Sequence, residues 1–454
     1  MNTRKLLLML LICSIGELAI SQSWEPLFNG KNLQGWESNG GAAKYHVADG
    51  SIVGITQPNT PNTFLCTKKN YGDFILELEV YLSDRVNSGI QFRSALKPAS
   101  QTVYGYQCEL DPSQRSWSGG IYDESRRGWL YPLSRNEPAK EAFLLSAWNT
   151  VRIECIGQEI NTFVNGIHAS RLVDDLSDEG FIGLQVHAID READAGKEIR
   201  WKNIRILTED LEKYKTPLDP RVPEISYLKN ELTEWERDHG FRLLWDGKTS
   251  NGWRGAKLEA FPESGWEIKD GVLTVLATDG GESTGPGDIV TTKMYSDFEL
   301  ELKFKISKGA NSGIKYLVDP TLNKGAGSAI GCEFQILDDA NHPDAKMGVK
   351  GNRTVGALYD LIAPKNLQTP WRKKSFNAEG WNTARIVSRD GNVTHWLNNE
   401  LIVSYDRFSH MFEALVNYSK YKNWEQFGRW AEGSILLQDH GNEVSFHSIK
   451  IREF

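Results

Sequence analysis

Two nine-residue segments of the chain alternate apolar and polar side chains. FILELEVYL occupies residues 74–82 and FELELKFKI occupies residues 298–306. Successive side chains of a β-strand point to opposite faces, so each segment predicts a strand with Phe, Leu and Val toward a core. The Glu and Lys side chains are then expected to face solvent. Two similar sheets are therefore predicted, one in each half of the chain.

Short apolar runs separated by turn residues predict further strands in both halves. Residues 148–169 contain turn signals at Gly157-Gln158 and Asn165-Gly166, and residues 381–403 contain one at Asp390-Gly391. Such dipeptides between β-rich runs indicate hairpins. Many short strands at regular spacing are typical of an antiparallel sandwich. A helical-looking segment, residues 411–430, has no counterpart in the first half.

The two halves of the chain share an ordered set of motifs, which indicates a tandem duplication of a whole domain. The landmarks recur in one order: LFNGKNLQGW with LLWDGKTSNGW, YGDF with YSDF, NSGI with NSGI, IYDE with LYDL, WNTVRI with WNTARI, and GLQVH with LLQDH. We therefore predict a first domain over residues 22–207 and a second over residues 238–454. Residues 208–237 carry Pro217, Pro220 and Pro223 and then a polar run, which predicts a linker with a short helix.

The first 21 residues have the pattern of a signal peptide. Arg4 and Lys5 precede an apolar run, and Ala19-Ile20-Ser21 suits cleavage before Gln22. The expected product is secreted or periplasmic, with a lipid anchor on Cys13 as the alternative. No later segment is long enough to span a bilayer as an apolar helix.

Composition narrows the possible partners. Of 454 residues, 40% are hydrophobic and 25% charged, the net charge is −8, and no basic block stands out. This balance argues against nucleic acid as the partner. The 15 Trp, 15 Tyr and 41 Gly suit sheets with tight turns and also sugar-binding surfaces. Cys66, Cys108, Cys155 and Cys332 lack zinc spacing, so buried thiols are expected, with one disulfide in the first copy left open.

The ordered set of motifs resembles the 3-keto-disaccharide hydrolase-like domain of exported bacterial proteins. The matching features are the F-N/D-G-K…GW opening, Asp49-Gly50 and Asp270-Gly271, Y-x-DF, NSGI, WNT-x-RI and LQDHG. The resemblance implies two concanavalin-like jelly-roll sandwiches, each with a ligand groove on its concave sheet. It also implies hydrolysis or elimination at the glycosidic bond of 3-keto-glycosides.

Each copy places one carboxylate and one amide on the same face of a middle strand. Gln107 and Glu109 alternate in the first copy, and Glu333 and Gln335 alternate in the second in swapped order. Such a pair suits sugar hydroxyls, and partial burial would bring the carboxylate toward a pKa fit for acid–base work. The alternative is a solvated outer face.

A histidine recurs in the late strand of both copies. His187 and His440 each follow a Gln-x pair, and Asp439 precedes only the second. Histidine is the usual acid or base near neutral pH. Because adjacent strand residues face opposite sides, Asp439 need not contact His440. A structural hydrogen-bonding role is the alternative for both histidines.

Loops over the sheet hold the remaining candidates for substrate binding. They are Tyr122, Asp123, Arg127 and Trp129 in the first copy and Arg353, Tyr359 and Asp360 in the second. In NSGI, Asn87 and Asn311 are also candidates, although a turn with glycine at positive φ is the favoured interpretation of that motif. Asp338, Asp339 and Asp344 suggest calcium as an alternative, but their spacing matches no calcium loop.

The leading hypothesis is an exported carbohydrate-active enzyme that acts on 3-keto-glycosides, with no cofactor. Glu333 and His440 are the predicted catalytic pair of the second copy, and Glu109 and His187 that of the first. The sequence favours the second copy as the stronger catalytic candidate. The alternative is a non-catalytic tandem lectin-like protein, because fold alone does not separate binding from catalysis.

Overall fold

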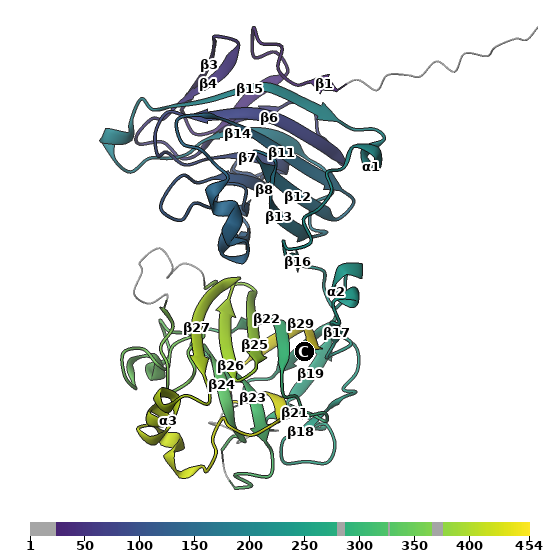
Figure 1. The fold of residues 1–454 in the computed structure, drawn as a ribbon, viewed down its shortest axis with the longest axis vertical. Helices are drawn as coiled ribbons and strands as arrows, with labels where there is room; N and C mark the ends of the chain where they lie inside the picture. Colours follow the sequence, from purple (N-terminus) through teal and green to yellow (C-terminus); the bar gives the residue numbers. More distant parts are fainter. Residues whose placement is uncertain (1–23, 279–286, 326, 366–375) are drawn as a thin grey trace, which may run out of the picture.

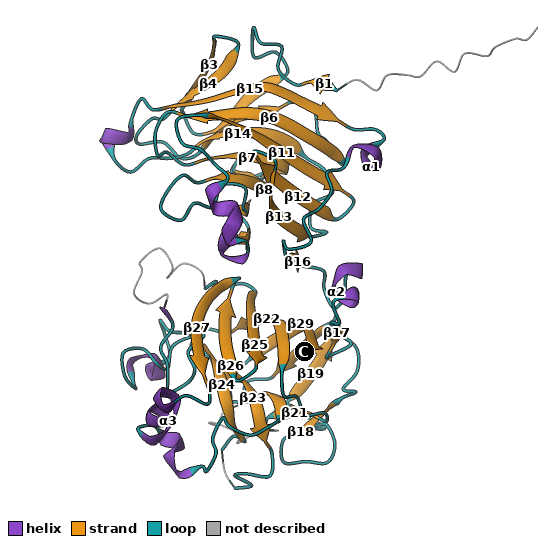
Figure 2. Cartoon of the chain, in the orientation of Figure 1, coloured by secondary structure: helices purple, strands orange, loops and turns teal. Residues whose placement is uncertain are grey.

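The computed structural model describes residues 24–278, 287–325, 327–365 and 376–454, and these residues form two β-sandwiches in tandem (Figure 1). Strands dominate both halves, as Figure 2 shows, so the prediction of an all-β fold is confirmed. The predicted signal peptide, residues 1–21, lies outside the described residues. Within the part of the chain that is described, no helix has the length and apolarity needed to cross a bilayer.

The first sandwich packs an outer sheet against an inner, concave sheet. The outer sheet has the order β16-β13-β12-β11-β6-β15-β4-β3, with β1 beside β15. Its strands are β1 Glu25–Pro26, β3 Lys44–Ala48, β4 Ser51–Ile55, β6 Phe74–Leu82, β11 Trp148–Ile156, β12 Glu159–Val164, β13 Ile167–Val173, β15 Glu198–Leu207 and β16 Glu224–Ser226. The inner sheet has the order β10-β9-β8-β7-β14-β5-β2. Its strands are β2 Trp36–Gly40, β5 Thr63–Thr67, β7 Ser88–Leu96, β8 Val103–Leu110, β9 Ile121–Glu124, β10 Gly128–Tyr131 and β14 Phe181–Val186.

The second sandwich repeats this plan with shorter sheets. Its outer sheet runs β19-β20-β29-β22-β25-β26-β27, with β17 beside β29, and its inner sheet runs β18-β21-β28-β23-β24. The outer strands are β17 Arg242–Leu243, β19 Trp266–Lys269, β20 Val272–Val275, β22 Phe298–Ile306, β25 Asn382–Arg389, β26 Asn392–Leu397, β27 Glu400–Asp406 and β29 Val444–Glu453. The inner strands are β18 Trp253–Gly255, β21 Ile289–Thr291, β23 Asn311–Asp319, β24 Ile330–Leu337 and β28 Ser434–Leu437.

The helices among the described residues are short and lie outside the sheets. They are α1 Leu211–Tyr214, α2 Glu234–Asp238 and α3 His410–Asn417, with 3₁₀ turns η1 Leu133–Arg135, η2 Glu137–Glu141, η3 Glu192–Asp194, η4 Pro343–Lys346 and η7 Lys420–Asn423. Thr233 begins α2 with a capping box, because it accepts from the Glu236 amide and Glu236 accepts from the Thr233 amide. Helix α3 and η7 belong to the predicted helical segment of the second copy.

The hairpins form where the sequence predicts them. Asn165 and Gly166 both have positive φ, at 50° and 80°, and Asp390 and Gly391 repeat this at 50° and 82°. Positive φ at both central residues is the requirement of the tight turn that matches strand twist. The strands that these turns join then bury their apolar faces between the two sheets of each sandwich. The four cysteines of the described chain are buried free thiols.

The linker takes part in the fold of the first domain. Strand β16 pairs in parallel with β13, so residues 224–226 extend the outer sheet of the first sandwich. Tyr227 follows directly and donates from its hydroxyl to the Leu130 carbonyl at 3.2 Å. The linker thus lies between the sandwiches and contacts the first one along several residues.

The prediction that Glu and Lys of both alternating strands face solvent holds in the second copy for Lys305 and is wrong for three other residues. Glu299, Glu301 and Lys303 of β22 are buried at 3%, 7% and 5% exposure. Lys450 of β29 pairs with Glu301 at 3.1 Å and also with Glu236 of α2. The linker helix and the first domain cover this outer face, and local alternation carries no information about such a contact.

Candidate functional site

The inner sheet of the first domain places its polar side chains on the face away from the core. In β8, Tyr106, Cys108 and Leu110 are buried between the sheets, while Gln107 and Glu109 point to the opposite face. That face lines a cavity of about 1170 Å³. Seven candidates from the sequence line it: Asn87, Gln107, Glu109, Tyr122, Arg127, Trp129 and His187.

Strand register supports the alignment of the two copies residue by residue. Gln107 pairs with Gln91, and Glu109 pairs with Gly89. Glu333 and Gln335 pair with Lys315 and Gly313 in the same way. The carboxylate and the amide therefore exchange places between the copies, as the sequence predicts. Lys315 of the second copy occupies the strand position that Gln91 occupies in the first.

The interpretation of NSGI as a turn is wrong, because the motif lies within strands β7 and β23 or at their start. Its glycine supplies space rather than a positive φ. A Cβ on Gly89 would lie 2.3 Å from Cδ of Gln107, and one on Gly313 would lie 2.4 Å from Oε1 of Glu333. The polar side chain of the neighbouring strand lies over this glycine in both domains.

Glu109 ends a chain of amides on the cavity floor. Gln91 donates to Gln107 at 2.8 Å, Gln107 donates to one carboxylate oxygen of Glu109 at 2.8 Å, and Asn87 donates to the other. Burial raises the pKa of Glu109 to about 7, although the two amide hydrogen bonds act to lower it. A carboxyl group with this pKa exchanges a proton near neutral pH.

Glu124 and His187 share the cavity with Glu109. Burial, and then the nearby Glu109 carboxylate, raises the pKa of Glu124, whereas His187 lowers it. Sequence reasoning did not select Glu124, although it lies two residues after Tyr122 on β9 and therefore on the same strand face. The first-domain side of the cavity thus gathers two carboxylates and an imidazole.

Gln185 is a second residue that sequence reasoning passed over. Its side chain is fully buried at the cavity, and neither its amide nitrogen nor its amide oxygen has a hydrogen-bond partner. The amide oxygen of Asn87 is also buried without a partner. A buried amide atom without a hydrogen-bond partner lowers the stability of the fold. A ligand with hydroxyl groups would supply the missing partners. The recurrence of Gln before His in both copies was the available signal.

Aromatic and basic side chains form the rim of the cavity. Trp129 packs edge-on against Trp117 at 4.7 Å and Tyr122 at 5.3 Å, and the Arg115 guanidinium lies 5.1 Å from the Trp129 ring. Burial raises the pKa of Tyr122 to about 12, so its hydroxyl remains a proton donor. These rings offer the flat surfaces on which sugars stack.

Asp123 does not line the cavity. It is completely buried and accepts from Arg126 at 2.6 Å and from Arg127 at 2.5 Å. Arg127 also pairs with Asp174. Asp123 therefore holds the two arginines in place, and Arg127 lines the cavity with its geometry set by two carboxylates.

The second domain brings its own candidates together on β23, β24 and β28. Asn311 lies 3.3 Å from the Nε2 of His440 and 3.3 Å from the Gln335 amide, and Gln335 lies beside Glu333. Lys315 approaches Glu333 at 3.7 Å. Asp439 is buried and accepts from the Gly287 and Gly441 amides, so it holds a loop, not His440. None of these residues lines the cavity described above.

The loop candidates of the second domain bind one another. Arg353 donates to Asp360 at 2.8 Å and to Asp344 at 3.0 Å, and the Tyr359 hydroxyl donates to Asp344 at 2.8 Å. The Asp344 carboxylate thus accepts hydrogen bonds from a guanidinium and a phenol. Within the described residues, no group of three His, Cys, Asp or Glu side chains is placed so that it could hold a metal ion.

The helical segment private to the second copy packs against this loop. The Lys420 amide donates to Asp360 at 3.1 Å, and its ammonium lies 4.3 Å from the Tyr359 ring. Tyr421 is buried beside them, and burial together with the nearby Glu333 carboxylate raises the pKa of its hydroxyl. In the first domain, strand β10 flanks Tyr122. In the second domain, the helical segment flanks Tyr359, the counterpart of Tyr122.

Comparison with known proteins identifies the family. The model of the 3-keto-alpha-glucoside-1,2-lyase-like domain matches residues 23–207 and again residues 240–452. The chain belongs to this family. The duplicated match accounts for both sandwiches and makes the protein a tandem, carbohydrate-active member of the 3-keto-disaccharide hydrolase-like group.

Proteins similar to this chain include a named relative and solved structures. A 3-keto-disaccharide hydrolase of Bacteroides thetaiotaomicron is 35% identical over 233 residues, covering 47% of this chain and 78% of that protein. A candidate glycosyl hydrolase of Parabacteroides distasonis is 30% identical, covering 50% of this chain and all of that one, with a TM-score of 0.43. A second from the same organism is 25% identical over 45% of this chain and all of the other, with a TM-score of 0.32.

Proposed function

We propose that the chain cleaves the glycosidic bond of 3-keto-glycosides in the groove of its first domain. The observation that carries the proposal is Glu109, a buried carboxyl group with a pKa of about 7 on the floor of a large cavity. Unpaired amide atoms of Asn87 and Gln185 surround it. The name of the Bacteroides relative and the family model support the substrate class.

The chemistry of a 3-keto sugar explains why one such carboxylate suffices. The C3 carbonyl acidifies the proton on C2, so a base removes that proton and leaves an enolate. The enolate collapses, a C1–C2 double bond forms, and the C1–O bond breaks with protonation of the leaving oxygen. Addition of water across the new double bond returns the proton to C2 and completes a net hydrolysis.

Residues of the first groove supply each role. We assign Glu109 as the base for the C2 proton and His187 as the acid for the leaving oxygen. Gln107, Gln185, Tyr122 and Arg127 are donors for the hydroxyls and the enolate oxygen, because all line the cavity. Two carboxylates acting as nucleophile and acid, as in ordinary glycosidases, are not needed.

The second groove has features that favour a supporting role. Glu333, its carboxylate, pairs with Lys315, and the loop with Tyr359 is locked to Arg353 and Asp344. We therefore propose that the first domain is the catalytic one, in contrast to the preference drawn from sequence. Residues 1–21 remain the reason to expect export.

Incubation of the whole chain with a 3-keto-glucoside and with the matching plain glucoside tests the function. Released aglycone is the measured quantity. We expect release only from the 3-keto compound, because the C2 proton of the plain sugar is not acidic. Binding of both sugars without release from either would instead favour the lectin-like alternative.

The pH profile of the reaction is expected to report Glu109. Because the base acts in its ionised form, kcat/KM should rise with pH through an apparent pKa near 7. In Asn87→Ala, Glu109 loses a donor to its ionised form, its pKa rises, and this limb moves to higher pH. Asn311→Ala, at the equivalent position of the second domain, is the control. A limb unmoved by Asn87→Ala would remove Glu109 as the titrating base.

Gln185→Met should separate a ligand-binding role from a structural one. Methionine fills a similar volume but removes two unpaired amide atoms, so the free energy of unfolding should stay constant or rise by about 1–3 kcal/mol. The KM for the 3-keto-glucoside should rise roughly 3- to 10-fold, which is the loss of one or two hydrogen bonds. Denaturant titration and steady-state kinetics provide both values. Gln438→Met is the control in the second domain; a fall in stability at Gln185→Met with unchanged KM would contradict the role.

A further inference from the structure

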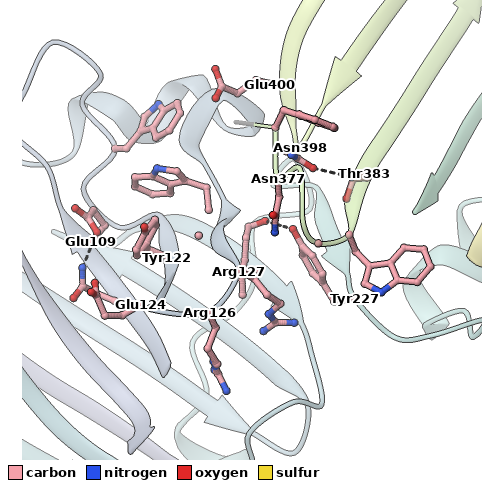
Figure 3. A pocket seen from close by; sticks show the side chains of 18 of the residues that line it. Glu109, Tyr122, Glu124, Arg126, Arg127, Tyr227, Asn377, Thr383, Asn398 and Glu400 are labelled. Carbon is pink, nitrogen blue, oxygen red and sulfur yellow. Dashed lines mark hydrogen bonds between the residues drawn. The ribbon is translucent and has the colours of Figure 1, made fainter. Parts of the chain in front are cut away.

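The cavity over Glu109 has a second wall that the first domain does not supply. This wall comes from the linker and the outer sheet of the second domain, and the close-up in Figure 3 shows Tyr227, Asn377, Thr383, Asn398 and Glu400 facing the first-domain residues. Lys303, Trp381 and His447 belong to the same wall. The second domain therefore faces the first groove with its outer sheet, whereas its own groove lies on its inner sheet.

Direct contacts fix this wall relative to the first domain. Asn399 donates to the Leu130 carbonyl at 3.3 Å and accepts from Ser134 through its carbonyl and from Arg135 through its side chain, at 3.0 and 2.9 Å. Lys303 lies 3.7 Å from the Tyr227 ring and donates to Thr383 at 2.6 Å. Asn399 is only 2% exposed, so the contact between the domains is closely packed where it borders the cavity.

The WNT motif of the second copy places Trp381 in this wall. Asn382 accepts from the Asn377 amide and donates back to the Asn377 carbonyl, so the asparagine clamps the preceding loop. Asn149 clamps the loop at Leu144 identically in the first copy. The tryptophans that precede them, Trp381 and Trp148, are 39% and 38% exposed and are not required for that clamp.

The two tryptophans differ in what they face. Trp148 lies on the free outer face of the first domain, 5.7 Å from Tyr81 and 4.0 Å from the Lys202 ammonium. Trp381 lines the cavity and packs edge-on against His447 at 4.2 Å. An exposed aromatic ring beside hydroxyl, amide and carboxylate groups has the composition of a sugar-binding surface.

We propose that the outer sheet of the second domain, with Trp381 as its stacking platform, binds the sugar residues that extend beyond the ring held over Glu109. The ligand class is a neutral oligosaccharide of two or more rings. The cavity volume of about 1170 Å³ exceeds the range of about 300–1,000 Å³ common for small-molecule sites, so it has room for more than one ring. The inference rests on the proposed function, because it assigns the reacting ring to the first groove.

Kinetics of Trp381→Ala on two substrates test this subsite. For a 3-keto-glucosyl disaccharide we expect roughly a tenfold fall in kcat/KM, the size of loss expected when an aromatic contact is truncated. For the methyl 3-keto-glucoside, which ends at the reacting ring, we expect no change. Trp148→Ala is the matched control and should alter neither value, and Trp381→Phe should give an intermediate loss on the disaccharide. Equal losses on both substrates, or none on either, would overturn the subsite.

Calorimetric titration separates failure of this inference from failure of the proposed function. The probe is the unoxidised disaccharide, titrated into the whole wild-type chain and into both tryptophan variants. If no 3-keto substrate is turned over but Trp381→Ala still weakens disaccharide binding where Trp148→Ala does not, the subsite stands and the reaction falls. If turnover is observed and the two variants bind equally, the reaction stands and the subsite falls.

Discussion

Glu109→Gln should lower kcat/KM for a 3-keto-glucoside by about 10²- to 10⁴-fold, which is the usual contribution of a positioned base. The substitution keeps the size of the side chain and removes its ability to take a proton. In the wild-type chain, Asn87 donates to one carboxylate oxygen of Glu109 and Gln107 donates to the other. The amide of the Gln variant has one accepting oxygen, so it keeps one of these hydrogen bonds and loses the other. Aglycone release under conditions of limiting substrate measures the effect.

Glu333→Gln is the matched variant for that experiment. It makes the same chemical change on the equivalent strand of the second domain, where the carboxylate pairs with Lys315. We expect kcat/KM to stay near the wild-type value. The reverse outcome, loss in Glu333→Gln and little change in Glu109→Gln, would move catalysis to the second groove, which the sequence favoured. Thermal melts of both variants ensure that the comparison concerns folded protein.

A buried carboxyl group with a raised pKa also links Glu109 to stability. Its folded-state pKa of about 7 lies above the ordinary value near 4.5, so the folded chain binds a proton that the unfolded chain releases between these pH values. Stability from this group is therefore greatest at low pH and declines as pH rises toward 7. Such a group is retained at a cost to stability, as expected for an acid or base at a functional site.

Much of the first groove could be predicted from the sequence because strand periodicity is local. Gln107 and Glu109 share a face since they are two residues apart, and duplication identified the equivalent strand in the second half. The same rule applied to β9 would have found Glu124 from Tyr122. Gln185 was harder to find, because what distinguishes it is the absence of hydrogen-bond partners, which only the packed structure reveals.

The parts that the sequence did not predict arise from packing between distant segments. Glu301 and Lys303 have the alternation of an exposed strand face, yet the linker and the first domain cover them. Trp381 and Trp148 occupy the same motif, and only the contact between domains places one of them in a cavity. The glycine of NSGI is likewise explained by the side chain of a neighbouring strand.

Lys450→Met should destabilise the second domain by about 3–5 kcal/mol, because it removes one partner of a buried ionic cluster. Lys450 pairs with Glu236 and Glu301, and all three are less than 10% exposed. Burial alone would raise the pKa of Glu301, yet Lys450 and Lys303 lower it to about 2. Without the lysine, two buried carboxylates face each other with less compensation. Urea unfolding at neutral pH, fitted as the sum of two domain transitions, measures the loss.

Arg205→Met isolates burial as the cause of that loss. Arg205 pairs with Glu77 at the same register position of the first domain, but its side chain is 51% exposed, so we expect a change of about 0–1 kcal/mol. Acidification should distinguish the two further. In Lys450→Met, Glu301 loses the charge that lowers its pKa most, so its folded-state pKa rises and the deficit should shrink as pH falls and Glu301 takes up a proton. Equal losses in both variants, or a deficit independent of pH, would mean that the stability supplied by the cluster does not depend on its burial.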